Sequence, residues 1–468
     1  MFDFVNEDEM IAGEAVPSIV PEEYLKEMTK HIDKTNVIDE ELYKEFNVKR
    51  GLRNANGTGV LVGLTNIGDI CGYATDEHHH KIPVEGQLHY RGYNIQELVA
   101  NYIKEDRFGF EEITYLLIFG ELPTEKELAD FKNYIGNRRA LPPGFARDMI
   151  LTTPSKSIMN KLARSVLALY CYDENPDDTS TENVLRQSID LIGYFPALLA
   201  YAYQAKVAFY DHQTLHLRQP LPELSTAENI LRMLRPHAKY TDLEAKVLDL
   251  CLILHAEHGG GNNSSFTTHL VSSSGTDTYA AISAAIGSLK GPKHGGANIS
   301  VIKMLKDLYK NVTDISDKSQ VDDYLIKVLK KEANDGSGLV YGMGHAIYTL
   351  SDPRAVLLKE MAKKLAEQEG KTEAFELCAY IEKRTPELYE EVFGVKKVMC
   401  ANVDLYSGLV YSILNIPNDI ATPLFALARL SGWSAHRIEE LTVGKKLIRP
   451  AYISVSEHKD FVPIKDRK

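Results

Sequence analysis

The stretch Tyr341-Gly342-Met343-Gly344-His345-Ala346-Ile347-Tyr348 is followed two residues later by Ser351-Asp352-Pro353-Arg354, and the two together organise the chain. Glycines let the backbone turn sharply and let a ligand come close to the peptide groups. Ser351 before Asp352 and Pro353 predicts a helix that begins here, with Ser351 as N-cap. The pattern therefore predicts an imidazole in a tight loop beside a carboxylate-binding guanidinium. Taken alone, it also fits a plain loop-to-helix joint with a surface arginine.

Composition bounds the class of protein. The 468 residues are 44% hydrophobic and 25% charged, which is ordinary for a soluble globular protein. This length allows about three domains, or one large core with a smaller lobe. The net charge of −12 argues against a broad nucleic-acid or anionic-membrane surface. An anionic ligand would need a local basic patch.

The cysteines and the N-terminus predict a compartment. The five cysteines are scattered, odd in number and never paired as CxxC, which indicates reducing conditions and no metal knuckle. The acidic stretch 1–9 has neither the apolar core of a signal peptide nor the arginines of a transit peptide. No apolar run reaches the roughly 18 residues that span a bilayer. We expect a cytoplasmic protein with no membrane segment.

Periodicity predicts a mainly all-α fold with a small β-hairpin region near the N-terminus. Frequent glycines and β-prone runs at 59–62 and 87–90 place the hairpin region between Gly51 and Tyr93. Its loop holds His78-His79-His80, which cannot all face one metal from a strand, so a polar loop is expected there. From Ile95 onward the apolar spacing is helical. Helices are expected at about 145–172, 181–206, 226–235 and 242–258.

A second glycine-rich joint, Gly291-Pro292-Lys293-His294-Gly295-Gly296-Ala297-Asn298, connects two helical segments. His294 stands just before a helix N-terminus, where the partial positive charge disfavours imidazolium. A neutral His294 can donate a hydrogen bond to an enolate-like oxygen. A turn histidine that caps the helix is the plain alternative.

Two further stretches carry possible chemistry. In His255-Ala256-Glu257-His258-Gly259-Gly260-Gly261, the two histidines stand at i and i+3 on a helix end, yet no third metal ligand is obvious, so no metal site is expected. The glycines favour close approach of a small polar ligand. In Ala401-Asn402-Val403-Asp404, Asn402 is a predicted N-cap and Asp404 lies in the first turn. A carboxylate there either complements the helix dipole or acts as a buried general base.

These stretches, in this order, resemble the citrate synthase family, in its bacterial-like form. The resemblance runs from about Gly86 to Pro450 and includes Leu88-His89-Tyr90-Arg91-Gly92-Tyr93 and the stretch 115–123. It implies an acyltransferase that condenses acetyl-CoA with oxaloacetate and hydrolyses the citryl thioester, the first step of the tricarboxylic acid cycle. No cofactor is implied, because acetyl-CoA is a substrate.

The resemblance also implies roles for individual residues. Asp404 would take a proton from the acetyl methyl group, His294 would stabilise the enolate, and His345 would polarise the ketone of oxaloacetate and protonate the alkoxide. The matching substrate-binding residues are His258, Arg354, Arg429 and Arg449. The matching positions for acetyl-CoA are Gly342, Gly344 and Lys397. The family takes the equivalent of Arg449 from a second subunit, so a homodimer is implied.

By the same resemblance, residues 1–294 plus 410–468 would form a large helical domain and residues 295–409 a small one, and oxaloacetate would close the two. The chain departs from the family at Gly259, Thr349 and Ala401, where glutamate, a basic residue and proline are common. Thr349 leaves the contacts with the CoA phosphates open. Two alternatives also stay open: a 2-methylcitrate synthase that uses propionyl-CoA, since one methylene discriminates weakly, and a non-catalytic CoA-binding relative.

Overall fold

The computed structural model describes residues 20–76 and 81–467, so His78-His79-His80 lie outside the described residues. The chain forms two compact units, one of residues 1–63 with 447–468 and one of residues 64–446. In the first unit, α1 (Glu22–Thr35) and α2 (Glu40–Glu45) bury none of their residues. The short turns η2 (Arg50–Leu52) and η6 (Ile464–Asp466) belong to the same unit.

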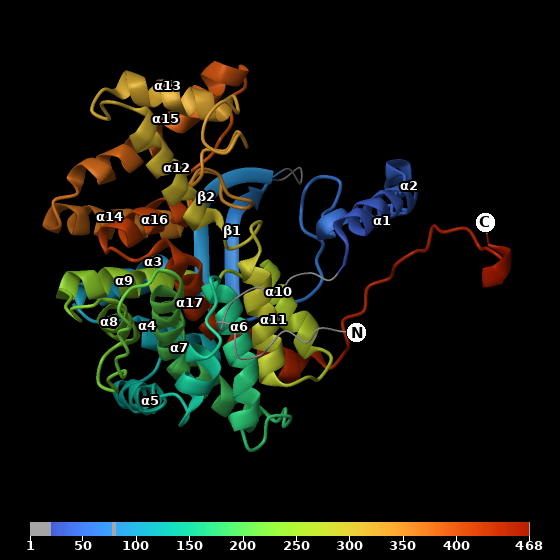
Figure 1. Ribbon diagram of the computed structural model, residues 1–468. Coiled ribbons are helices and arrows are strands. Elements are labelled where there is room, and N and C mark those ends of the chain that lie inside the picture. The colour runs from blue at the N-terminus through green and yellow to red at the C-terminus, as the bar shows by residue number, and fades with distance from the viewer. Residues whose placement is uncertain (1–19, 77–80, 468) are drawn as a thin grey trace. The chain divides into compact units, whose positions relative to one another are not determined.

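The larger unit begins with the expected hairpin. Strand β1 (Gly68–Thr75) pairs antiparallel with β2 (Lys81–Tyr90) (Figure 1). Strand β2 also pairs with the short β3 (Tyr93–Asn94). The predicted strand at 59–62 is wrong: Gly59 forms only an isolated bridge with Arg53. Its apolar side chains have strand propensity but gain no partner strand to pack beside.

The remainder of this unit is helical, which confirms the mainly all-α class. The long helices are α3 (Ile95–Lys104), α4 (Phe110–Phe119), α5 (Glu125–Asn137), α6 (Ile158–Leu169), α7 (Thr181–Tyr210), α8 (Thr226–Leu234), α9 (Asp242–His255), α10 (Asn263–Ser272), α11 (Thr278–Lys290), α12 (Ala297–Asn311), α13 (Lys318–Leu329), α14 (Pro353–Gln368), α15 (Thr372–Phe393), α16 (Val403–Ile413) and α17 (Asn418–Glu439). Single turns lie at η3 (Ala146–Leu151), η4 (Tyr170–Tyr172) and η5 (Glu440–Gly444). Among the described residues, no helix combines the length and apolarity needed to cross a membrane.

Two predicted helices end differently in the structure. The segment 145–172 is interrupted between η3 and α6, because Pro154 disfavours helix before it and Ser157 caps a new helix by accepting a hydrogen bond from the Asn160 N–H. Helix α9 ends at His255 rather than at 258. Beyond it, the backbone of Glu257 is bonded by the Tyr90 hydroxyl instead of by the helix. The two histidines of this stretch therefore do not share a helical face.

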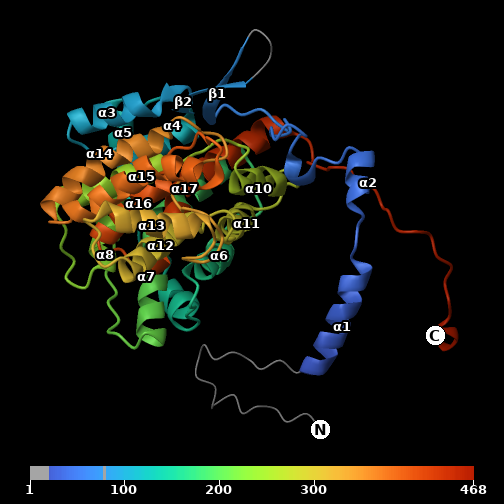
Figure 2. The ribbon, with the colours of Figure 1, turned by 90° about the horizontal axis from the view of Figure 1, so that it is seen from above.

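Helix α17 lies near the middle of the larger unit in the view from above (Figure 2), and it contacts α4, α7, α9, α10, α11 and α12. Its Trp433 is fully buried. A second, smaller apolar core gathers side chains between Met304 and Leu388, from the helices α12, α13 and α15 that stand together in Figure 1. This core falls inside the small domain predicted from residues 295–409, and the domain boundaries themselves stay a prediction.

Candidate active site

The glycine loop before His345 is bound to the start of α16. The Gly344 N–H donates to the Cys400 carbonyl at 2.7 Å, and the Asn402 N–H donates to the Gly342 carbonyl at 2.9 Å. The Asn402 side chain, the predicted N-cap, also donates from Nδ2 to the Gly344 carbonyl at 2.8 Å. These bonds place His345 and Asp404, which are 59 positions apart in the sequence, on two segments that are hydrogen-bonded to each other.

Each glycine of the loop adopts a positive φ, +88° at Gly342 and +84° at Gly344. A Cβ on Gly342 would lie 2.8 Å from the Leu405 side chain, so only glycine allows this approach to α16. A Cβ on Gly344 would meet nothing within 4 Å among the described atoms. The Cα of Gly344 thus faces open space among the described atoms, and the contact of Gly344 with acetyl-CoA stays a prediction.

The ring of His345 has a defined tautomer. Its Nδ1 accepts hydrogen bonds from the Ile347 N–H at 3.1 Å and the Tyr348 N–H at 3.2 Å. Burial, followed by the charge of Arg354, lowers the pKa of His345 to about 4. The neutral ring therefore carries its proton on Nε2 and can donate from there. The ring also stacks on Tyr348, with centroids 4.7 Å apart.

His258 stands edge-on to His345, with ring centroids 5.2 Å apart. Its Nε2 is buried and has no hydrogen-bond partner among the described residues. Burial, followed by the charge of Arg354, holds the pKa of His258 well below its usual value. A buried polar atom left unpaired costs free energy, so this nitrogen is available to a polar ligand.

Arg354 is buried in the first turn of α14, only 4% exposed. Its Nε donates to Asp352 Oδ1 at 3.0 Å and its Nη2 to Oδ2 at 2.8 Å, which leaves Nη1 outside this pair. The N-cap of α14 is Asp352, which corrects the prediction of Ser351. The reason is that the Ser351 hydroxyl instead accepts from the Gly86 N–H in β2, at 3.1 Å.

Arg429 lies on α17 and is 1% exposed. Its Nε donates to the His255 carbonyl at 2.7 Å, whereas Nη1 has no partner within the described part of the chain. Burial, helped by the charge of Arg354 and opposed by that of Glu257, lowers the pKa of Arg429 to about 10. Arg354 and Arg429 thus form the local basic patch that an anionic ligand needs in a chain of net charge −12, and the neutral His258 lies beside them.

His294 lies before α12, and its Nε2 is 3.2 Å from the Ser264 hydroxyl. That hydroxyl also accepts from Trp433 Nε1 at 3.1 Å. The pKa of His294 is lowered to about 4, first by burial and then by the charge of Arg429. The ring is neutral as expected, and burial and Arg429 both favour this form. Ser264 and Trp433 belong to the site and were missed, because no sequence spacing links them to His294.

Asp404 lies in the first turn of α16, and its N–H donates to Asn402 Oδ1 at 3.0 Å. Its carboxyl is enclosed by protein, although part of the residue still reaches solvent. Desolvation raises the pKa of Asp404 to about 6; Arg354 opposes this shift and Asp352 adds to it. A carboxylate with this pKa is a general base well matched to neutral pH.

Two predicted site residues, Lys397 and Arg449, are exposed. The Nζ of Lys397 lies 5.0 Å from the ring centroid of Tyr389. Arg449 belongs to the unit of residues 1–63 and 447–468. The roles of both therefore stay predictions.

A cluster with metal-ligand geometry lies elsewhere, formed by His269, His436 and Glu439, whose ligand atoms lie within 4.8 Å of one another. Its ring nitrogens already have protein partners. His269 Nε2 is 3.0 Å from His436 Nδ1, His269 Nδ1 is 2.8 Å from Glu440, and His436 Nε2 is 3.1 Å from Glu257. Two hydrogen bonds and one ion pair between protein groups account for the arrangement of these rings.

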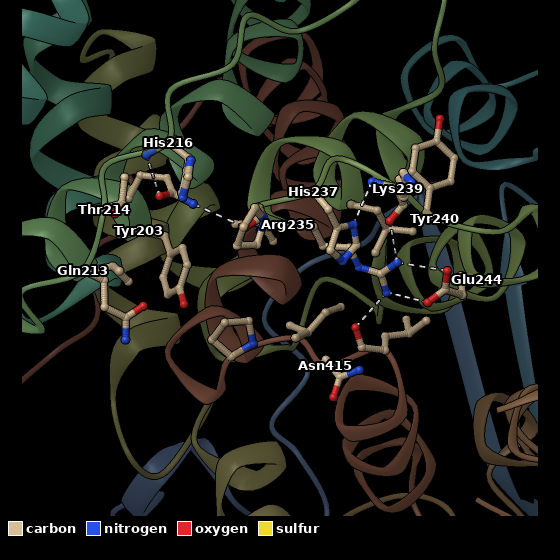
Figure 3. A pocket seen from close by; sticks show the side chains of 18 of the residues that line it. Tyr203, Gln213, Thr214, His216, Arg235, His237, Lys239, Tyr240, Glu244 and Asn415 are labelled. Atoms are coloured by element: carbon tan, nitrogen blue, oxygen red, sulfur yellow. Dashed lines mark hydrogen bonds and ion pairs between the residues drawn. The ribbon is translucent and has the colours of Figure 1, made fainter. Parts of the chain in front are cut away.

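A cavity of about 860 Å³ opens beside α7, α9 and α16 (Figure 3). Arg235 on its wall is bound to Glu244, at 2.5 Å, and to the Leu414 carbonyl at 2.9 Å. None of the candidate site residues lines this cavity. It is therefore separate from the site built around His345 and Asp404.

Two neutral imidazoles, a carboxylate whose pKa is near 6, and two buried guanidinium groups meet in a mainly helical fold. This combination defines an enzyme that moves protons on carbon and oxygen while it holds a small anionic substrate.

Comparison with known proteins identifies the family. Residues 55–451 match the family model described as "Citrate synthase, C-terminal domain". A citrate synthase of Synechocystis is 35% identical over 390 residues, 83% of this chain and 90% of that protein. A 2-methylcitrate synthase of Shewanella oneidensis is 30% identical over 81% of this chain and 92% of that protein. The chain belongs to the citrate synthase family.

Solved structures agree with this family. A citrate synthase of Thermoplasma acidophilum, in a ternary complex with carboxymethyl coenzyme A and oxaloacetate, is 26% identical with a TM-score of 0.70. The match covers 90% of this chain and 99% of that one.

Gly342→Ala should uncouple the glycine loop from α16. The new Cβ would collide with Leu405 and would also require a left-handed backbone conformation. Because displacements of about 1 Å near reacting groups cost roughly 100-fold, we expect steady-state turnover to fall at least ~10-fold. Gly275→Ala is the matched control, since Gly275 has a φ of +79° and nothing within 4 Å of its added Cβ among the described atoms. Equal turnover in the two variants would contradict the role of this contact.

Proposed function

We propose that the residues gathered around His345 carry out the reaction of citrate synthase. The chain condenses acetyl-CoA with oxaloacetate and hydrolyses the citryl thioester, giving citrate and CoA in the first step of the tricarboxylic acid cycle. The assignment of residues rests on the closeness of two chain segments. The loop that holds His345 is hydrogen-bonded to the helix start that holds Asp404, beside the buried pair Arg354 and Asp352.

The first step is proton removal from the acetyl methyl group. Asp404 is ionised above a pH of about 6 and takes this proton, while the electron pair of the C–H bond forms the enolate. His294 donates a hydrogen bond to the enolate oxygen. Trp433 donates to the Ser264 hydroxyl, which leaves the hydroxyl proton free to bond His294 Nε2. The proton of the neutral His294 ring is then on Nδ1 and is directed to substrate.

The second step forms the carbon–carbon bond. The enolate carbon attacks the ketone carbon of oxaloacetate, and the ketone oxygen gains the electron pair of its π bond. His345 donates from Nε2 to this oxygen and then transfers the proton to the alkoxide, because its Nδ1 is held by two backbone N–H groups. Arg354, Arg429 and His258 bind the carboxylates of oxaloacetate. Water then hydrolyses the thioester and releases CoA.

The assembly is proposed to be a homodimer in the cytoplasm. Arg449 would complete the oxaloacetate site of the partner subunit, as the family resemblance implies. Large apolar side chains in the unit that contains Arg449 support a second copy as partner, because such surfaces mark interaction sites. They are exposed at Tyr24, Leu25, Ile32, Tyr452, Phe461 and Ile464.

A thiol-release assay tests the reaction itself. Oxaloacetate is supplied with acetyl-CoA or propionyl-CoA in turn, and we expect higher kcat/KM with acetyl-CoA. A higher value with propionyl-CoA would instead assign a 2-methylcitrate synthase. No thiol release with either substrate would identify a non-catalytic relative.

Asp404→Asn keeps the size of the side chain but removes the base. We expect turnover to fall by at least ~100-fold, the usual contribution of a general base, with oxaloacetate affinity little changed. In the unmodified enzyme, kcat/KM for acetyl-CoA should rise with pH and level off above about 6, because the carboxylate form is the active one. Asp419→Asn is the control, since Asp419 pairs with Lys206 at 2.9 Å outside the site. Near-normal turnover in Asp404→Asn would refute the assignment.

Whether Arg449 enters the site of the partner subunit is tested by mixing two inactive variants. Arg449→Ala and Asp404→Ala homodimers should each be inactive. After subunit exchange, a heterodimer carries both lesions in one site and none in the other, so it should recover up to about half of the activity of the unmodified dimer. If mass measurement confirms exchange and no activity returns, Arg449 does not serve the partner's site.

A further inference from the structure

A chain of charged and imidazole groups, fully buried at one end, lies next to the proposed oxaloacetate-binding residues. Glu257 Oε1 is 3.1 Å from His436 Nε2, and His436 Nδ1 is 3.0 Å from His269 Nε2. His269 Nδ1 is then 2.8 Å from Glu440. Glu257 and His436 are both 0% exposed. A buried carboxylate of this kind needs a partner of opposite charge, and His436 is positioned to supply it.

The carboxylate of Glu257 is confined to a narrow slot between β1 and α17. A Cβ added to Gly432 would lie 2.3 Å from Glu257 Oε2, and one added to Gly68 would lie 2.8 Å from Cγ. Two glycines from distant parts of the chain therefore make space for this side chain. The carboxylate has little freedom to move away from His436.

Because Glu257 is confined in this slot, the backbone of residues 255–258, which includes the proposed substrate-binding His258, is held in place. After α9 ends at His255, Tyr90 Oη lies 3.1 Å from the Glu257 carbonyl oxygen, to which it donates. Arg429 Nε donates to the His255 carbonyl at 2.7 Å. His258 follows directly and presents its ring to His345. The position of Glu257 therefore sets the positions of His258 and of the carbonyl that orients Arg429.

Two carboxylates and one imidazole face His436. Glu257 faces it from the segment after α9, Glu439 from α17 at 3.8 Å, and His269 from α10. Beyond this ring, Glu440 bonds His269, Arg91 faces Glu257 and Glu439, and Arg429 faces Glu257. Glu257 thus interacts with three cations, Arg429, His436 and Arg91, of which only Arg429 is a proposed substrate-binding group.

We propose that the Glu257–His436 pair positions the oxaloacetate-binding groups: it holds residues 255–258 in place and gives Arg429 a buried counter-charge. This inference rests on the binding roles proposed for His258 and Arg429. Neither Glu257 nor His436 touches the reacting atoms, so both are positioning residues. Their loss should weaken oxaloacetate binding more than it slows the chemical steps.

The protonation of His436 supplies a test that needs no variant. Burial opposes the imidazolium, but Glu257 and Glu439 outweigh it and raise the pKa of His436 to about 9. The charged form therefore prevails below pH 9 and is lost above it. We expect the Kd of oxaloacetate, measured by calorimetry on the unmodified enzyme, to increase as the pH rises through about 9.

His436→Gln removes the charge and keeps a similar shape. Because Glu257 would then lack its buried counter-charge and its segment would be held less firmly, we expect the Kd of oxaloacetate to rise about 10-fold at pH 7.5, with kcat within about twofold. The rise in Kd above pH 9 should also disappear. Arg437→Gln is the matched control: this neighbouring buried cation binds Thr278, Ser272 and the Thr276 carbonyl, away from Glu257.

A merely structural role predicts something else. His436→Gln and Arg437→Gln would then lower Tm alike and leave the Kd of oxaloacetate unchanged, which would overturn the proposal. The double variant Glu257→Gln with His436→Gln should bind oxaloacetate no more weakly than the weaker single variant, since both remove one pair. If the losses of oxaloacetate affinity in the two single variants instead add up in the double variant, Glu257 and His436 do not act as a pair. Arg429→Gln, measured alongside, separates the hypotheses: an unchanged Kd there would reject the binding role of Arg429 itself.

Discussion

The bonds between the glycine loop and the start of α16 are the constraint on which the site depends. Gly344 N–H to the Cys400 carbonyl, and Asn402 to the carbonyls of Gly342 and Gly344, join two segments that neither helix nor sheet would otherwise align. Backbone bonds of this kind fix position without long side chains, whose rotamers would loosen it. His345 and Asp404, the proposed acid and base, are therefore held next to each other by the protein itself.

The site also depends on compensation of buried charge, because each buried arginine of the site interacts with a buried carboxylate. Asp352 binds Arg354 directly through two hydrogen bonds, whereas Glu257 supports Arg429 through space. Without these anions, two guanidinium groups in a desolvated pocket would repel each other and lose hydration. The same desolvation keeps His294 and His345 neutral and raises the pKa of Asp404 to about 6. One physical condition thus sets both binding and acid–base chemistry.

Much of the fold and site could be predicted from local patterns. The helices, the hairpin and the N-cap Asn402 follow from short-range spacing of residues. The protonation states expected for His294 and Asp404 follow from burial. The end of α9 could not be predicted, because a tyrosine hydroxyl 167 positions away in sequence takes over the backbone of Glu257. Ser264 and Trp433 were missed for a similar reason. Their partner His294 is defined by packing between helices, which no local period encodes.

Helix α17 carries several of the residues that hold the site together. Arg429, Gly432, Trp433 and His436 follow one another at i, i+3, i+4 and i+7, so they occupy a single stripe of one helix. That stripe touches the His255 carbonyl, the Glu257 carboxylate and the Ser264 hydroxyl. A small rotation or translation of α17 would therefore disturb all of these contacts at once. Natural variation along the stripe should therefore be correlated, with substitutions tolerated in combinations rather than one at a time.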